Sequence, residues 1–133
     1  MKRLMPFLAA AAAAAALTVS AATAAPEHHA PNTCFASNNW TSWSSPGGGN
    51  VLLLRVGLHD IYRVELSAPT RVRYTGDMHL VNRVHGSDWI CSALDLNLTL
   101  ADHNGFRQPL IATGLRKLTP AEVAAIPRKD LPA

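Results

Sequence analysis

The sequence is poor in charge, in aromatic residues and in cysteine. Only 16% of its residues are charged, 6% are aromatic, and two are cysteine. Beyond residue 24, ten Lys or Arg face nine Asp or Glu, a net charge of +1 that predicts no electrostatic binding of nucleic acid. A chain of 133 residues has room for one domain, which excludes a multidomain enzyme with a separate cofactor domain. We therefore expect neither a nucleic-acid partner nor a cofactor.

Long hydrophobic runs are also absent, except at the start of the chain. Lys2 and Arg3 precede an alanine-rich apolar run over residues 4–19, and small residues follow up to Ala24. This order predicts a signal peptide over residues 1–24, cleaved after Ala24. The alternative is a transmembrane anchor, which needs about twenty apolar residues, more than this run supplies. We expect export to the periplasm or the extracellular space, with no stable membrane anchor after cleavage.

The two cysteines, Cys34 and Cys91, are an even pair in a chain that is expected to be exported. In an oxidising compartment such a pair is typical of a disulfide. The alternative is a reactive thiol, which needs a neighbouring histidine or cation to lower its pKa. Neither cysteine has such a neighbour in sequence, so the disulfide is favoured.

Residues 25–33 are polar, contain two prolines, and predict a flexible leader before a single β-rich domain over residues 34–126. Two β-prone runs, 51–56 and 61–66, flank a turn-sized spacer and predict a β-hairpin. Leucines at both odd and even positions of the first run indicate a strand covered on both faces.

Further strands are predicted with less regular patterns. Leu94, Leu96, Leu98 and Leu100 alternate with polar residues, which predicts a half-buried strand. A turn ending in Asn104-Gly105 follows, and Pro109 restricts the next strand to a sheet edge. The remaining predicted strands, or strand-like segments, cover residues 34–43, 71–75, 78–84 and 106–112.

The C-terminal region contains one clear helix signal. Thr119 is a predicted N-cap, Pro120 occupies the first helical position, and Glu122 stands three residues after the cap. The helix is expected to end near Ile126, and residues 127–133 to form a fraying tail. The predicted fold class is therefore mainly β, a small antiparallel sheet folded as a barrel or sandwich, with one short C-terminal helix.

No catalytic or metal-binding motif is present. The histidines fall in the leader or beside separate turns, without the close spacing of a metal site, and no catalytic residue is predicted. The leader residues His28 and His29 are the candidates for a metal-binding alternative. The candidate binding residues are His59, Asp60, Tyr62, Trp40 and Trp43. The two tryptophans could line a ligand groove or simply belong to the core.

Four segments carry a resemblance: Cys34-Phe35 and residues 56–64, 89–95 and 118–123. In this order they resemble an uncharacterised secreted family of proteobacteria, domain of unknown function 6491. The resemblance implies a Gram-negative exported protein and brings no activity with it. It also implies two further cysteines in relatives, where this chain has Thr70 and Gln108. If those two pair with each other, Cys34–Cys91 is the remaining bridge.

These observations favour a non-enzymatic exported β-domain. It would bind a protein, an envelope component or a small ligand through a strand edge or a loop cluster. One alternative is a small periplasmic hydrolase that uses histidine and aspartate from hairpin turns, with His59, Asp60, Asp77 and His79 as candidates. A second alternative is a periplasmic metal carrier that uses the histidine-containing leader.

Overall fold

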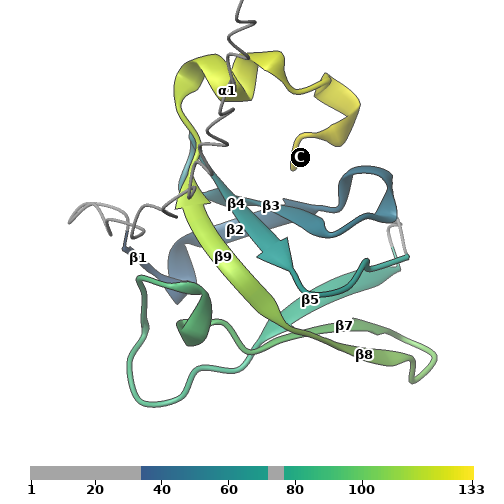
Figure 1. The fold of residues 1–133 in the computed structure, drawn as a ribbon. Helices are drawn as coiled ribbons and strands as arrows, with labels where there is room; N and C mark the ends of the chain where they lie inside the picture. The colour runs from purple at the N-terminus through teal and green to yellow at the C-terminus, as the bar shows by residue number, and fades with distance from the viewer. Residues whose placement is uncertain (1–33, 72–76) are drawn as a thin grey trace, which may run out of the picture.

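The computed structural model describes residues 34–71 and 77–133, which form three antiparallel sheets and one short α-helix (Figure 1). The sheet orders are β1-β6, β2-β3-β4-β9 and β5-β7-β8. The predicted mainly β class is confirmed, and in the described residues the sheets pack face to face without closing into a barrel. The strands are Phe35–Ala36 (β1), Trp40–Ser44 (β2), Val51–Val56 (β3), Asp60–Leu66 (β4), Met78–Asn82 (β5), Trp89–Ile90 (β6), Leu98–Asp102 (β7), Arg107–Leu110 (β8) and Ala112–Lys117 (β9).

The predicted hairpin is the centre of the four-stranded sheet. β3 and β4 pair in unbroken register from Val51↔Glu65 to Val56↔Asp60. Gly57 opens the turn with a φ of +61°, a conformation that glycine adopts without steric cost. The predictions for residues 1–33, and for residues 72–75 of the predicted strand 71–75, lie outside the described residues, and Arg71 itself is not in a strand.

The main core lies between the four-stranded and three-stranded sheets. Leu52 and Leu54 of β3 meet Leu98 and Leu100 of β7 there, in one cluster of buried side chains. Burial of each such side chain contributes about 1.5–3 kcal/mol. Other buried members of this cluster are Phe35, Trp43, Val56, Tyr62, Val64, Leu66, Ile90, Leu96 and Leu110.

The opposite face of β3 and β4 is covered by the C-terminal region. Leu53 and Ile61 pack with Leu118, and the partly buried Val123 and Ile126 add to this smaller cluster. The expectation that β3 is covered on both faces is therefore confirmed. Figure 1 shows the helix α1, Pro120–Ala125, on this side of the sheet.

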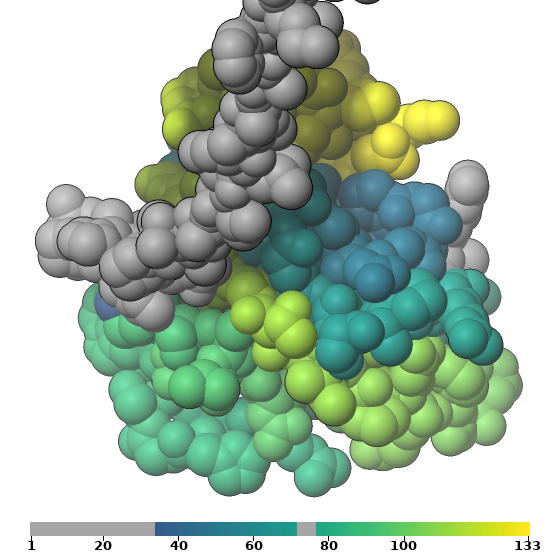
Figure 2. Space-filling view, viewed as in Figure 1, coloured from purple at the N-terminus to yellow at the C-terminus, as the bar shows by residue number. Residues whose placement is uncertain are grey.

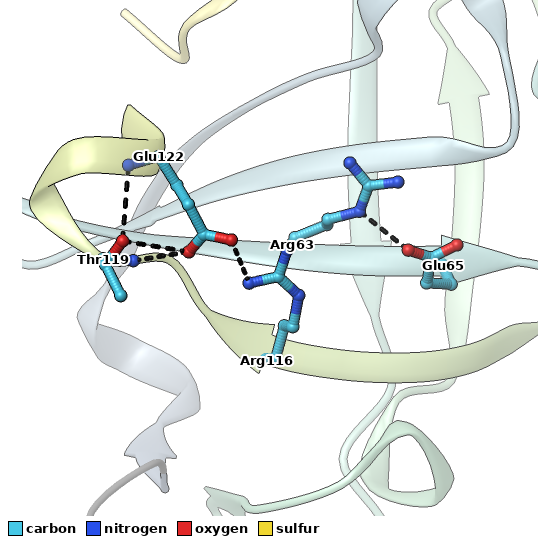
Figure 3. A network of polar contacts seen from close by, with 5 residues as sticks. All are labelled: Arg63, Glu65, Arg116, Thr119 and Glu122. Atoms are coloured by element: carbon cyan, nitrogen blue, oxygen red, sulfur yellow. Dashed lines mark hydrogen bonds and ion pairs between the residues drawn. The ribbon is translucent and has the colours of Figure 1, made fainter. Parts of the chain in front are cut away.

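Helix α1 begins with the predicted capping box (Figure 3). Thr119 Oγ1 accepts a hydrogen bond from the Glu122 amide, and Glu122 Oε2 accepts one from the Thr119 amide at 2.8 Å. Arg116 of β9 donates to the other carboxylate oxygen, also at 2.8 Å. Strand β9 and the helix are thus joined by the same carboxylate. A second ion pair, Arg63–Glu65, lies on the same face of the sheet.

The last residues of the chain do not fray, contrary to the sequence expectation. Residues Arg128–Asp130 form a 3-10 turn, and Pro132 is buried. The Ser44 hydroxyl donates to the Asp130 carbonyl at 2.6 Å, and Arg55 donates twice to the Pro132 carbonyl. The expectation failed because the donors that hold these carbonyls stand more than 75 residues earlier in the chain.

The predicted strand over residues 94–100 is wrong in its first half. Leu94 is 95% exposed and lies in a 3-10 turn, Ala93–Asp95, so that the strand begins only at Leu98. The Asp95 carboxylate accepts hydrogen bonds from the amides of Cys91 and Ser92, at 2.9 and 2.8 Å. This capping of a tight turn overrides the alternating pattern.

Two other strand boundaries differ from the expectations. The predicted segment 34–43 is divided by a 3-10 turn, Ser37–Asn39, into β1 and β2, which belong to different sheets. Strand β9 was not predicted at all. It contains Gly114, whose backbone lies against the Glu65 side chain, and two consecutive cations, which hide its alternation.

A bent pair of strands connects the two larger sheets. β8 is an edge strand of the three-stranded sheet, as Pro109 predicted, and only Ile111 separates it from β9 of the four-stranded sheet. The β7–β8 turn is held by Asp102, whose carboxylate accepts hydrogen bonds from the amides of Asn104 and Phe106 at 2.8 Å.

Figure 2 shows the green segments of the three-stranded sheet below and the yellow C-terminal residues above.

The predicted disulfide between Cys34 and Cys91 is confirmed. Cys34 precedes β1 and Cys91 follows β6, and these two strands pair with each other. A disulfide of this kind indicates an oxidising compartment, such as that of an exported protein. Among the described residues, no helix has the length and apolar character needed to cross a membrane.

Candidate binding groove

A groove of about 580 Å³ lies between the edge of the four-stranded sheet and the edge of the three-stranded sheet. One wall comes from β2 and the 3-10 turn before it, and the other wall comes from β5. Within the described residues, each of these strands pairs on one side only. The groove therefore has a strand edge along both walls. Such edges carry backbone groups that can pair with another strand.

The walls of the groove combine apolar side chains with polar ones. Along β5, Met78, Leu80 and Asn82 alternate with the more exposed His79 and Val81. This period of two places the first three on the inner face, where Met78 and Leu80 pack against the main core. The apolar part of the opposite wall is formed by two tryptophans, Trp40 and Trp43.

Two buried side-chain atoms in the described part of the chain have no hydrogen-bond partner, and both belong to residues that line this groove. They are the Ser42 hydroxyl and Nδ2 of Asn82. The other amide atom of Asn82 is satisfied, because Oδ1 accepts from the Asn97 amide at 2.8 Å. A buried polar atom without a partner costs about 1–3 kcal/mol. Nδ2 is thus a buried donor without a partner beside the groove.

Strand β2 is shaped by its own side chains. The Trp40 indole donates to the Ser42 carbonyl at 2.9 Å, across a bulge in the pairing with β3. The Thr41 hydroxyl lies 3.4 Å from the carbonyls of Arg55 and Gly57. The first of these contacts holds the indole ring of Trp40, which lines the groove.

The structure brings two of the predicted binding residues, Trp40 and Trp43, to this groove. Trp43 is also part of the main core, so the two interpretations of its role coincide. Of the groove residues on β5, only His79 was a candidate, for the hydrolase alternative; Met78, Leu80 and Asn82 were not predicted, because they look like ordinary strand residues in sequence. A weak signal was available in the alternation over residues 78–82, which is that of a half-buried strand.

The other predicted binding residues lie at the β3–β4 hairpin and do not line this groove. His59 is exposed in the turn, and Asp60 forms an ion pair with Lys117 at 2.7 Å. The hydrogen bond to Asp60 raises the pKa of Lys117. Tyr62 is buried against Phe35, with ring centres 4.6 Å apart, and burial raises the pKa of its phenol.

The four residues of the hydrolase hypothesis stand on two separate elements. His59 and Asp60 belong to the β3–β4 hairpin, whereas Asp77 and His79 stand at the start of β5. No hydrogen bond or ion pair between described residues joins the two pairs. In residues 34–71 and 77–133, no three His, Cys, Asp or Glu side chains gather to hold a metal ion. His28 and His29 lie outside the described residues.

Two further hollows occur on the surface of the described residues. One, of about 750 Å³, lies under the C-terminal segment, where Arg55 and Ser44 already donate to carbonyls of that segment. The other, of about 510 Å³, has a rim formed by Leu94 and the 68% exposed Ile111. Ser42 borders the first of these as well as the groove. Of the three hollows, only the groove is lined by Asn82, whose Nδ2 has no partner.

Comparison with known proteins adds no relative to this description. No protein-family model, no curated protein and no solved structure matches the chain.

Proposed function

We propose that this protein is an exported, non-enzymatic binding module that takes an extended polypeptide segment into the groove between β2 and β5. The single observation that supports this proposal is the free edge of β5 along a groove whose opposite wall carries Trp40. An extended segment suits such a site, since its backbone can pair with the free edge of β5 and extend the sheet.

The recognition would be divided between backbone and side chains. Backbone pairing with β5 gives affinity that is independent of sequence, and alternate side chains of the segment would face the Trp40 and Leu80 walls. Because these walls are apolar and aromatic, we expect a preference for segments with aliphatic or aromatic residues at every second position. A tryptophan at a binding surface is a frequent source of binding energy.

The place of action follows from the disulfide and the N-terminal sequence. A Cys34–Cys91 bond is favoured in an oxidising compartment, and residues 1–24 have the order of a signal peptide. We infer a periplasmic or extracellular protein whose partner is a polypeptide exposed in the same compartment. Membership of the secreted proteobacterial family, domain of unknown function 6491, is part of this proposal and is consistent with that location.

The proposal is tested by selecting heptapeptides from a phage-displayed library on the purified chain, residues 25–133. The selected peptides should bind the wild-type protein, and Trp40→Ala should weaken binding at least tenfold. Trp89→Ala is the matched control, because Trp89 is 58% exposed and does not line the groove. Methylation of alternate backbone amides of the peptide should abolish binding, since strand addition depends on these donors.

Two results would overturn the proposal. The first is binding that survives both backbone methylation and the Trp40→Ala substitution. The second is a selection that yields no peptide, together with a small molecule shifting the amide signals of β5 and Asn82. The latter would identify the groove as a small-ligand site.

A further inference from the structure

Two histidines meet on the outer face of the three-stranded sheet, and the proposed function does not use their pairing. The rings of His79 and His103 lie with their centres 5.3 Å apart. The sequence gives no hint of this contact, because 24 residues separate them and each stands beside a different turn.

The register of β5 and β7 explains why the two rings meet. His79 pairs with Ala101 and Met78 pairs with Asp102, so that His103 continues the same face two residues beyond Ala101. Diagonal neighbours of this kind in an antiparallel pair lie within reach of large side chains. Ala101, between them in the register, is small and leaves the space above it free for the imidazoles.

The backbone that carries His103 is held in place. Asp102 Oδ1 accepts hydrogen bonds from the amides of Asn104 and Phe106, both at 2.8 Å, and these bonds span His103. His79 lies within β5, with ladder partners on either side of its own pair. The two imidazoles therefore project from fixed backbone positions, which reduces the entropy lost when both bind one ion.

We propose that His79 and His103 together form a binding site for a divalent transition-metal ion, with Zn²⁺ as the reference ion. Imidazole nitrogen is a preferred ligand of Zn²⁺, Cu²⁺ and Ni²⁺. An ion held in both ring planes by Zn–N bonds of about 2.0–2.1 Å would lie roughly 3.2 Å from each ring centre. With ring centres 5.3 Å apart, the angle at such an ion would be about 110°, close to tetrahedral.

The chemistry of the site follows from its having two protein ligands. Two tetrahedral positions remain for water or for donors from another molecule, an arrangement that resembles open sites more than closed structural ones. His79 also lines the groove, so a bound ion would lie beside the groove wall. Arg107 pairs with Ala101 from the other side and adds a positive charge to this face, so that Arg107→Ala should strengthen ion binding.

The site is tested by titrating the chain, residues 25–133, with Zn²⁺ and following the ring signals of all six histidines by NMR. The His79 and His103 signals should shift together at the lowest concentrations of Zn²⁺. Replacement of either histidine by alanine should reduce the affinity of the other for Zn²⁺ at least tenfold, because the chelate is lost. His59→Ala combined with His85→Ala is the matched control, since both side chains are exposed and lie outside the strands, His59 in a turn and His85 in a loop.

The NMR titration also distinguishes Zn²⁺ binding at His79 and His103 from binding at the two histidines of the leader. A His28→Ala, His29→Ala variant should retain the coupled shifts of His79 and His103. The proposal is overturned if these two signals move no earlier than those of His59 and His85, if only the leader histidines respond, or if each of the pair titrates independently of the other. Unchanged amide spectra of the single variants verify that the fold is intact. Peptide binding through Trp40 does not enter this test.

Discussion

The two larger sheets of this protein differ in how they are covered. The four-stranded sheet has the main core on one face and α1 with the C-terminal segment on the other. The three-stranded sheet has the core on one face, and its outer face exposes His79, Val81 and Arg107. The four-stranded sheet thus contributes more of the buried core residues. The three-stranded sheet has a solvent-exposed outer face and an unpaired edge. The comparison suggests a division between a stabilising part and a binding part.

The largest effect on stability is expected from removal of the disulfide, because it links the segments that lead into the two sheets. Cys34 leads through β1 into β2 of the four-stranded sheet, and Cys91 leads through a 3-10 turn into β7 of the three-stranded sheet. Replacing both cysteines by serine should cost about 4 kcal/mol of unfolding free energy, from the loop entropy of a bridge spanning 57 residues. Urea unfolding of the wild-type and variant proteins measures this difference.

The same variant shows whether the two parts are coupled by the bridge. In hydrogen exchange, β5 and β7 should lose protection before β3 and β4 when the disulfide is removed. A loss below about 1 kcal/mol, with both sheets still exchanging together, would mean that packing alone joins them.

The second test compares one outward-facing residue of each sheet. Leu53 of the four-stranded sheet is 2% exposed and packs with Leu118. Val81 is 40% exposed and lies on the solvent-exposed face of the three-stranded sheet. Leu53→Ala should cost about 2–4 kcal/mol through the cavity it leaves, and Val81→Ala less than about 1 kcal/mol. Equal costs in thermal or urea unfolding would contradict the division.

A third test concerns the C-terminal segment, which covers one face of the four-stranded sheet. Arg55→Met keeps the apolar stem but removes the donors to the Pro132 carbonyl, which should cost about 1–2 kcal/mol and release the last residues. Faster amide exchange at Leu131 and Ala133 reports the release. Arg63→Met is the control, because its exposed ion pair with Glu65 should contribute less than about 1 kcal/mol. Similar effects of both variants would show that the tail adds no specific cover.

The smallest effect is expected at the capping box of α1. The Thr119 amide, followed by Arg116, lowers the pKa of Glu122 from its ordinary value of 4.5. The folded carboxyl therefore holds its proton less tightly than the unfolded one, so its contribution is complete above pH 4.5 and is lost as the pH falls through the lowered pKa. Acidification should loosen α1 while the strands remain protected.

Amide shifts of Thr119 and Val123 against pH measure this loosening. Glu122→Gln should remove the acid transition at these two amides, whereas Glu65→Gln should leave it in place. A transition that persists in Glu122→Gln would assign the acid sensitivity to another group.

Local features of the sequence predicted much of the fold. The β3–β4 hairpin, the turn at Asn104-Gly105 and the start of α1 depend on neighbours within a few residues, and all three are present. The disulfide was predicted from the compartment and the even number of cysteines. Where the outcome depends on distant partners, the sequence was less informative. Strand β9 is a strand because it pairs with β4. The C-terminal segment is ordered because Ser44 and Arg55 donate hydrogen bonds to its carbonyls.

The same contrast between local sequence features and distant partners applies to the candidate sites. Trp40 and Trp43 were singled out because tryptophans of a β-sheet protein can line a ligand groove, and both lie at the groove. Asn82 became notable only when its amide was found buried without a partner. The approach of His79 to His103 depends on the register between β5 and β7, which turn lengths and packing fix together. No local pattern near either histidine contains that information.

Pro109 has a consequence for assembly. It has no amide hydrogen to offer a neighbour, so β8, the edge strand that contains it, is a poor template for adding a further strand. The β5 edge of the same sheet has no proline and faces the wall formed by β2. A strand added at β5 would have that wall on its far side instead of open solvent. The groove would then accept one chain and stop, which prevents the β5 edge from propagating into a fibre.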